Sequence, residues 1–335
     1  MKVLPLYLPH LGCRHLCVYC NQPLTVGHAE DQPGWNRRLE EAFSTSSRQE
    51  WELAFYGGTF SALSQGEMEQ CFAQIALYQK DPRVTGIRIS TRPDAVESNT
   101  LKYLWQRGVR TIELGVESLD DRVLQKSGRG HTSETAIQAC HRVKEFGFRT
   151  GIHLMCGLPR QNTDSWRETV DTAVTLPIDM VRIAPTLVLK GTALEQLYRR
   201  GTFQPITLEE AIQQCMYGYR KFYAQGIAIV RVGLSLSDDS GSGEDKIIAG
   251  PWHPALRHEV EARLVREKVL TVLSDRTESE IRVHPRDISI VLGEKKCNPA
   301  FWSEKLGSSL TIRQEPIVER HHFMLDHQEC YCYFK

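Results

Sequence analysis

The run Thr111-Ile112-Glu113-Leu114-Gly115-Val116 has the composition of a short buried strand and stands between two segments of helical length. Residues 98–107 precede it and residues 132–146 follow it, both with apolar residues at helical spacing. These segments end at Gly108 and Gly147, where glycine commonly terminates a helix. The same alternation extends in both directions along the chain. Its other apolar runs are residues 3–8, 53–56, 87–91, 150–155 and 180–184.

Alternating units of this kind predict an α/β protein in which a parallel sheet packs against helices, either as an open doubly wound sheet or as a full or partial barrel. Six such units fit before about residue 235. Residues 235–245 lack apolar periodicity and predict a mobile loop or linker. Beyond it, residues 256–270 predict a helix, and residues 281–283 and 288–291 predict strands. We therefore expect a core domain over residues 1–235 and a small α+β domain over residues 236–335.

The composition excludes several classes of protein. The chain has 335 residues, 41% of them hydrophobic, with 41 Lys and Arg against 41 Asp and Glu. It is therefore neither a disulfide miniprotein, nor a generally disordered chain, nor a wholly basic nucleic-acid binder. Because it has no long apolar stretch and its first ten residues do not resemble a signal peptide, we expect a cytoplasmic protein without a membrane segment. In that reducing compartment its ten cysteines are thiols or metal ligands.

Three of these cysteines, Cys13, Cys17 and Cys20, form a Cys-x3-Cys-x2-Cys motif directly after the first predicted strand. Three thiolates on one short loop can hold three irons of a 4Fe-4S cluster and leave the fourth iron open to a small ligand. The alternatives are plain buried thiols and a zinc site with a histidine as the remaining ligand. The histidines in question are His10, His15 and His28.

This motif at this place resembles the radical S-adenosylmethionine (SAM) superfamily. The resemblance implies a partial (β/α)6 barrel with a small C-terminal appendage, a 4Fe-4S cluster on the three cysteines, and SAM as the second cofactor. In that superfamily, reductive cleavage of SAM yields a 5′-deoxyadenosyl radical, and the electron comes from a donor of flavodoxin or ferredoxin type. Tyr7 and Tyr19 match aromatic positions of the family, the first beside the cluster and the second beside the adenine.

Motifs after the later strands extend the resemblance to about residue 233. Gly57-Gly58-Thr59 resembles the motif that binds the methionyl amine, where glycine lets a ligand approach the backbone closely. Arg129 matches an arginine near the cofactor carboxylate, which suits a guanidinium fork. His153 matches a position that faces the ribose. The remaining positions that the resemblance assigns to the cofactor site are Ser90, Glu117 and Ala184.

Two branches of the superfamily come into consideration, the radical domain of the Elongator catalytic subunit and the oxygen-independent coproporphyrinogen oxidases. Ser90-Thr91-Arg92-Pro93-Asp94 favours the Elongator-like branch. The porphyrin enzymes usually carry glutamate, glutamine and aspartate in place of Ser90, Glu117 and His153. The resemblance therefore favours an RNA base as the substrate, with tRNA as the candidate RNA. A small metabolite or tetrapyrrole is the alternative, and a non-catalytic cluster or haem carrier is another.

The C-terminal part offers weaker patterns. The chain is too short for a full acetyltransferase domain of the Elongator kind and lacks an acetyl-CoA phosphate loop, so acetyl transfer is not implied. We expect the appendage to cover the mouth of the barrel and to govern the choice of substrate. Its basic residues form either a phosphate-binding patch or an ordinary solvated surface: Arg282, Arg286, Lys295 and Lys296. A second metal could lie on His321, His322, His327, Cys330 and Cys332. The scattered cysteines are predicted to be buried apolar side chains: Cys71, Cys140, Cys156, Cys215 and Cys297.

Overall fold

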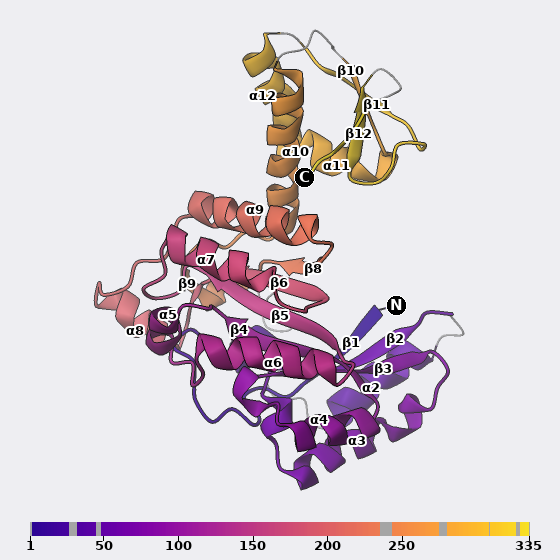
Figure 1. Ribbon diagram of the computed structural model, residues 1–335, viewed down its shortest axis with the longest axis vertical. Coiled ribbons are helices and arrows are strands. Elements are labelled where there is room, and N and C mark those ends of the chain that lie inside the picture. Colours follow the sequence, from indigo (N-terminus) through magenta and orange to yellow (C-terminus); the bar gives the residue numbers. More distant parts are fainter. Residues whose placement is uncertain are drawn as a thin grey trace.

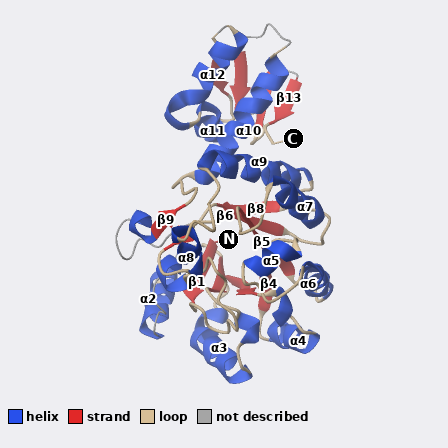
Figure 2. Ribbon diagram, turned by 90° about the vertical axis from the view of Figure 1, so that its left-hand side faces the viewer, coloured by secondary structure: helices blue, strands red, loops and turns tan. Residues whose placement is uncertain are grey.

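The computed structural model describes residues 2–26, 32–44, 48–234, 243–274, 280–307, 309–325 and 329–334. Its centre is a parallel sheet that curls into a half-barrel (Figure 1, Figure 2). The strands of this sheet, in spatial order, are β1 (Lys2–Tyr7), β2 (Trp51–Tyr56), β3 (Val84–Thr91), β4 (Val109–Glu117), β5 (Arg149–Cys156), β6 (Met180–Pro185) and β8 (Ala228–Val232). The predicted α/β class and partial barrel are confirmed.

The six predicted β/α units are present, and β8 adds a seventh strand at the edge of the sheet. Only Val232 of β8 is buried, so this strand has no continuous apolar run by which a sequence pattern would reveal it. The first six strands coincide with the six predicted apolar runs to within a few residues.

The two faces of the sheet differ in chemistry. Outward side chains such as Ile87, Ile89 and Ile112 are fully buried against the helices. The helices of this part are α1 (Gln22–Val26), α2 (Gln32–Phe43), α3 (Gln65–Gln79), α4 (Ser98–Gln106), α5 (Asp121–Lys126), α6 (Ser133–Glu145), α7 (Thr163–Ala173), α8 (Ala193–Arg199) and α9 (Leu208–Ala224). Figure 2 shows α2, α3, α4, α6, α7 and α9 around the outside of the curled sheet.

The inward face carries charged residues in the middle of strands. Arg88 on β3 donates to Glu52 on β2 (Nε to Oε2, 2.8 Å) and to Glu113 on β4 (Nη1 to Oε1, 2.5 Å). All three side chains are buried. Thr111 also donates to Glu52. Because buried charges are tolerated only when paired, this network makes a polar interior possible below the carboxyl ends of the strands.

A small antiparallel pair, β7 (Val188–Leu189) and β9 (Ile247–Ala249), returns the chain to the half-barrel. Together with α8 it packs against the cysteine loop, where Val18 and Tyr19 contact an apolar cluster that includes Val188 and Leu194. The amide of Leu194 also donates to the carbonyl of Val18 (2.7 Å). The predicted mobile loop falls largely on residues 235–242, which lie outside the described residues.

The C-terminal lobe consists of α10 (Leu256–Leu273), α11 (Ile288–Leu292) and α12 (Cys297–Leu306) beside a sheet of β11 (Thr311–Gln314), β10 (Glu280–Val283), β12 (His322–Leu325) and β13 (Glu329–Cys332). The expected α+β character is present, but the predicted strand at residues 288–291 is wrong, since these residues form α11. A short apolar run does not distinguish a buried helix from a strand. Here His284 caps a turn over Pro285–Asp287 that leads directly into α11.

The lobe does not cover the mouth of the barrel, contrary to expectation. Helix α10 packs on α9, outside the half-barrel, and the rest of the lobe extends away from the sheet (Figure 1). Among the described residues, none after Leu234 lines the cavity at the carboxyl ends of the strands. Of the helices that the structure describes, none is both long and apolar enough to cross a membrane.

Candidate active site

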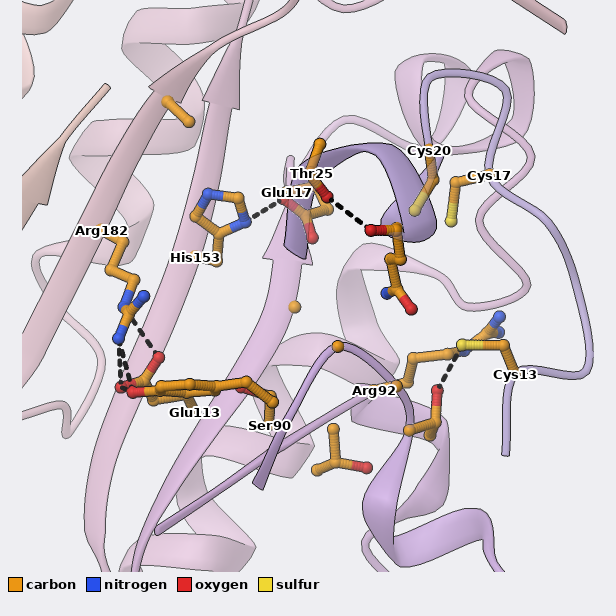
Figure 3. Close-up of a pocket in the computed structure, with 18 of the residues that line it drawn as sticks. Cys13, Cys17, Cys20, Thr25, Ser90, Arg92, Glu113, Glu117, His153 and Arg182 are labelled. Atoms are coloured by element: carbon orange, nitrogen blue, oxygen red, sulfur yellow. Dashed lines mark hydrogen bonds and ion pairs between the residues drawn. The ribbon is translucent and has the colours of Figure 1, made fainter. Parts of the chain in front are cut away.

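A cavity of about 520 Å³ opens at the carboxyl ends of the strands and extends into the half-barrel. Its walls come from the cysteine loop and from all seven strands of the sheet or the turns that follow them. Every residue that the sequence analysis assigned to the cluster or to SAM lines this one cavity: Tyr7, Cys13, Cys17, Tyr19, Cys20, Gly57, Gly58, Thr59, Ser90, Glu117, Arg129, His153 and Ala184. Figure 3 shows the cysteines on one side of it, Arg182 and Glu113 on the other, and Glu117 and His153 between.

The cysteine loop and the glycine turn after β2 interlock through their main chains. The amide of His10 donates to the carbonyl of Gly57 (2.7 Å), and the amide of Thr59 donates to the carbonyl of Leu11 (2.9 Å). A Cβ on Gly58 would lie 2.3 Å from the carbonyl oxygen of Leu11, a distance that no side chain tolerates. Glycine is therefore required at position 58 by the packing of the loop, quite apart from any ligand.

The three cysteines of the loop face the cavity (Figure 3). Cys13 Sγ lies 3.3 Å from Thr59 Oγ1, and Cys17 Sγ accepts a hydrogen bond from Arg129 Nη1 (3.0 Å). Burial, followed by the charges of the neighbouring Cys17 and Cys13, raises the pKa of Cys20 to about 12. Without a bound cation, the three thiols therefore do not all ionise together near neutral pH.

Of the three histidines named in the zinc alternative, His10 and His15 line the same cavity as the cysteines. His10 Nε2 already accepts a hydrogen bond from the amide of Gln22 (3.1 Å), and His28 lies outside the described residues. Within the described ranges, no three His, Cys, Asp or Glu side chains converge closely enough to hold a single metal ion. This finding includes Cys13, Cys17 and Cys20, so it does not decide between zinc and a cluster.

Near the C-terminus, the described histidines and cysteines likewise do not converge closely enough to hold a single metal ion. His322 and Cys332 are partners across β12 and β13, while the ring of His321 packs against that of Phe334 (centroids 5.3 Å apart). His327 falls outside the described residues.

Glu117 is the buried centre of the cavity wall. It ends β4 with a left-handed backbone (φ 67°), and its Oε2 lies 2.9 Å from Nδ1 of His153. Arg129 Nη1 lies 3.9 Å from Glu117 Oε1, and Arg129 Nη2 donates to the carbonyl of Gly115. Burial alone would raise the pKa of Glu117, but the charges of His153 and Arg129 outweigh it and lower that pKa. Glu117 is therefore a carboxylate at neutral pH.

Several buried polar atoms along this wall have no hydrogen-bond partner. Within the described part of the chain they include Nε of Arg129 and the hydroxyl of Tyr19. Buried polar groups in folded proteins are nearly always hydrogen-bonded, so unpartnered atoms that face one cavity indicate that a polar ligand completes it.

The sequence analysis missed a second group of cavity residues, on the side away from the cysteines. Arg182 Nε lies 2.8 Å from Glu113 Oε2, and Arg182 Nη2 donates to the hydroxyl of Tyr56 (2.6 Å). The guanidinium also lies over the Tyr56 ring, 4.9 Å from its centroid. Single charged residues inside the apolar runs 87–91, 111–116 and 180–184 were the signal for this group.

The remaining predicted residues lie elsewhere. Cys71, Cys140, Cys156 and Cys215 are buried as predicted, whereas Cys297 is exposed because it begins α12 at a surface turn. Arg282 of the basic patch lies 3.3 Å from Glu280 and 3.7 Å from Glu315, so its charge is already compensated. Arg286, Lys295 and Lys296 are exposed on the lobe, outside the cavity.

Comparisons with known proteins agree with this fold and cavity. Residues 7–173 match the Radical SAM superfamily, and residues 178–266 match the Radical_SAM C-terminal domain. The chain therefore belongs to the radical SAM superfamily.

Within the superfamily, the chain is 34% identical over 138 residues to a tRNA uridine(34) acetyltransferase of Methanocaldococcus infernus, which covers 40% of this chain and 26% of that protein. It is 23% identical over 234 residues to the heme chaperone HemW of Bacillus subtilis, which covers 68% of this chain and 61% of that protein. A solved structure of the archaeal Elp3 from Methanocaldococcus infernus has the same fold, with a TM-score of 0.60 at 22% identity. That match covers 79% of this chain and 63% of the other, so the chain spans only part of these relatives.

Proposed function

We propose that the protein is a radical SAM enzyme that cleaves SAM reductively and acts on an RNA substrate, with tRNA as the leading candidate. The observation that carries this proposal is the one cavity that Cys13, Cys17 and Cys20 line together with the unpartnered atoms of Arg129 and Tyr19. Its volume of about 520 Å³ lies within the range of small-molecule sites.

The residues of the cavity fit the two cofactors in their chemistry. Cys13, Cys17 and Cys20 would hold a 4Fe-4S cluster, since three thiolates suit a cubane with one open iron. Arg129 would meet the carboxylate of SAM, because a guanidinium suits a carboxylate. Glu117, as a buried carboxylate, would accept hydrogen bonds from the ribose hydroxyls, with His153 beside it. When bound, the cluster supplies an electron from a flavodoxin- or ferredoxin-type donor, and SAM supplies a 5′-deoxyadenosyl radical that abstracts a hydrogen atom.

The rest of the chain positions these groups. The main-chain bonds between the cysteine loop and residues 57–59 fix the loop over the ends of the strands. Arg129 orients Cys17 by donating to its sulfur and neutralises part of the negative charge that three thiolates bring. The ion pair of His153 with Glu117 keeps the imidazole at the cavity wall.

The RNA substrate rests on the relatives. The chain resembles a tRNA uridine(34) acetyltransferase and an Elongator complex protein 3 of Bos taurus, the latter at 25% identity over 212 residues. The likeness to HemW spans more of the chain and favours a second candidate, a cluster protein that carries haem without turnover. The two candidates differ in whether SAM is consumed.

The deciding experiment is an assay for 5′-deoxyadenosine. Anaerobically reconstituted protein is incubated with SAM and dithionite, with and without bulk tRNA, and the product is measured by mass spectrometry. We expect product from the native chain and from Cys297→Ala, none from Cys17→Ala, and more product when intact tRNA is added. An iron-loaded protein that forms no 5′-deoxyadenosine would overturn the enzymatic proposal. Equal stimulation by tRNA and by its nucleoside digest would replace RNA by a small-molecule substrate.

A further inference from the structure

We infer that Arg182 and Arg231 form a binding subsite for an oxyanion of the substrate, a carboxylate or a phosphate, on the side of the cavity away from the cysteines. As a substrate subsite it rests on the proposed function, but its geometry does not. Arg182 on β6 and Arg231 on β8 are register partners on neighbouring parallel strands and line the same cavity. Register partners on adjacent strands point to the same face of a sheet, about 5 Å apart at the backbone.

A bulge brings Arg231 to this position. The pairing of β6 with β8 runs from Val181 and Ile229 directly to Arg182 and Arg231, so Val230 is an extra residue without a partner. Without the bulge, Val230 would stand opposite Arg182 and Arg231 would point to the other face. Register shifts also occur in the pairings of β2 with β3, β3 with β4 and β4 with β5. Bulges frequently occur beside active sites, where they redirect a side chain.

Arg182 is oriented before any ligand arrives. Glu113 holds it through both oxygens, with Nε 2.8 Å from Oε2 and Nη2 donating to Oε1 over 3.0 Å. Tyr56 accepts a further bond from Nη2 (2.6 Å). Among the described residues, the hydrogen bonds of Arg182 all use Nη2, so Nη1 is left to bind a ligand. A guanidinium fixed in this way loses little conformational freedom on binding an anion.

Arg231 is unpaired. Its residue is exposed, and its side chain makes no hydrogen bond or ion pair with any residue in the part of the chain that the structure describes. Among the described residues, the acids Glu52 and Glu113 lie with the cations Arg88, Arg182 and Arg231 on this side of the half-barrel. One positive charge is therefore in excess. Since like charges directly opposite each other on paired strands are unfavourable, an anion between them would relieve the repulsion.

This subsite is distinct from Arg129, which we propose binds the carboxylate of SAM. Arg129, the arginine beside the cysteines, is bonded to Cys17 and Gly115, whereas Arg182 and Glu113 lie on the opposite side of Glu117 and His153 (Figure 3). Two guanidinium groups on one wall suit a bidentate or bridging oxyanion. The substrate would then present its anionic group to β6 and β8 and its reacting carbon to the middle of the cavity.

The test uses chemical protection of arginines in the reconstituted full chain, without SAM or reductant. Phenylglyoxal modifies accessible guanidinium groups, and mass spectrometry reports the modification rate at each one. Succinate and inorganic phosphate serve as probes of the two oxyanion types. At about five times its dissociation constant, a bound anion should slow modification of Arg231 about sixfold by mass action. Arg200, an exposed arginine at the end of α8, is the internal control and should not be protected.

Protection of Arg231 by succinate alone assigns a carboxylate, and protection by phosphate alone assigns a phosphate. Arg231→Lys, which keeps the charge but loses the fork, should weaken anion binding to Arg182 about tenfold, and Arg200→Lys should not change it. Equal protection of Arg231 and Arg200 would show ionic screening only, and no protection of Arg231 by either anion would likewise overturn the inference. Because SAM is absent, these outcomes are separate from a failure of the proposed radical chemistry.

Discussion

The cysteine side and the arginine side of the cavity are held together in different ways. On the cysteine side, main-chain hydrogen bonds join two loops, and Gly58 leaves no room for a Cβ. On the arginine side, side chains from separate strands meet as buried ion pairs, among them Glu113 with Arg88 and Arg182. The first side is therefore sensitive to the shape of the backbone, and the second is sensitive to charge.

The largest expected effect is a loss of bound iron, which depends on the cysteine side of the cavity. Replacing Cys13, Cys17 or Cys20 by alanine should remove essentially all of the about four irons expected per chain, because a cubane with two protein thiolates is weakly held. Cys297→Ala is the matched control, since Cys297 is exposed and distant from the cavity. Iron and sulfide analysis after anaerobic reconstitution measures both variants. Full iron content in a Cys17→Ala protein would contradict the assignment.

On the arginine side, Glu113→Gln should lower the free energy of unfolding by about 4 kcal/mol, because it leaves the buried charge of Arg88 without one of its partners. Glu267→Gln is the control, since it breaks an exposed pair with Arg220 (2.6 Å) and should cost about 0.5 kcal/mol or less. Denaturant unfolding measures both. Similar small losses in the two variants would mean that the interior network contributes no more than a surface pair.

On the cysteine side, Gly58→Ala should lower the free energy of unfolding by about 3 kcal/mol and displace the cysteine loop, because the added Cβ meets the carbonyl of Leu11. Gly66→Ala in α3 is the matched control. Nothing lies within 4 Å of a Cβ there, so this change should stabilise the helix by about 0.5 kcal/mol. If Gly58→Ala retains native stability and a full cluster, the interlocking of the two loops is not what holds the cysteines.

A smaller effect is expected in the pH dependence of stability. Burial, followed by the charge of Arg129, lowers the pKa of His131 from 6.5 to about 4. The unfolded chain therefore binds a proton at a higher pH than the folded chain, and stability falls as the pH drops from about 6.5 towards 4. Between pH 7 and pH 5, protonation of His131 in the unfolded chain should lower the free energy of unfolding by about 2 kcal/mol. Urea unfolding of the metal-free chain at pH 7 and pH 5 measures this loss, which should be smaller in His131→Gln than in the native chain. The same pH dependence in both proteins would contradict the assignment to His131.

The two sides also differ in how far the sequence reveals them. Cys13, Cys17 and Cys20 are close in sequence and Gly57-Gly58 are adjacent, so both motifs can be recognised in the sequence, and the family resemblance predicts their joint role. Arg88, Glu113 and Arg182 each stand alone in an apolar run and become neighbours only through the register of three strands. Arg231 reaches the cavity through a bulge, which no sequence pattern indicates.

Similar reasons explain the errors in the C-terminal half. Strand β8 exposes most of its residues, and the apolar run at residues 288–291 fits a helix as well as a strand. The position of the lobe depends on the packing of α10 against α9, where Tyr219 donates to Glu261 (2.7 Å) and Arg263 pairs with Glu209. Contacts of this kind arise between surfaces that the sequence does not identify as partners.

The most direct measurement of the central claim is the electron paramagnetic resonance spectrum of the dithionite-reduced, iron-loaded protein with and without SAM. Because the cysteine loop offers only three thiolates to the cluster, SAM should bind the open iron and change the spectrum of the reduced cluster. We predict a clear change in the g values at saturating SAM. Identical spectra with and without SAM, in protein with about four irons per chain, would contradict the account.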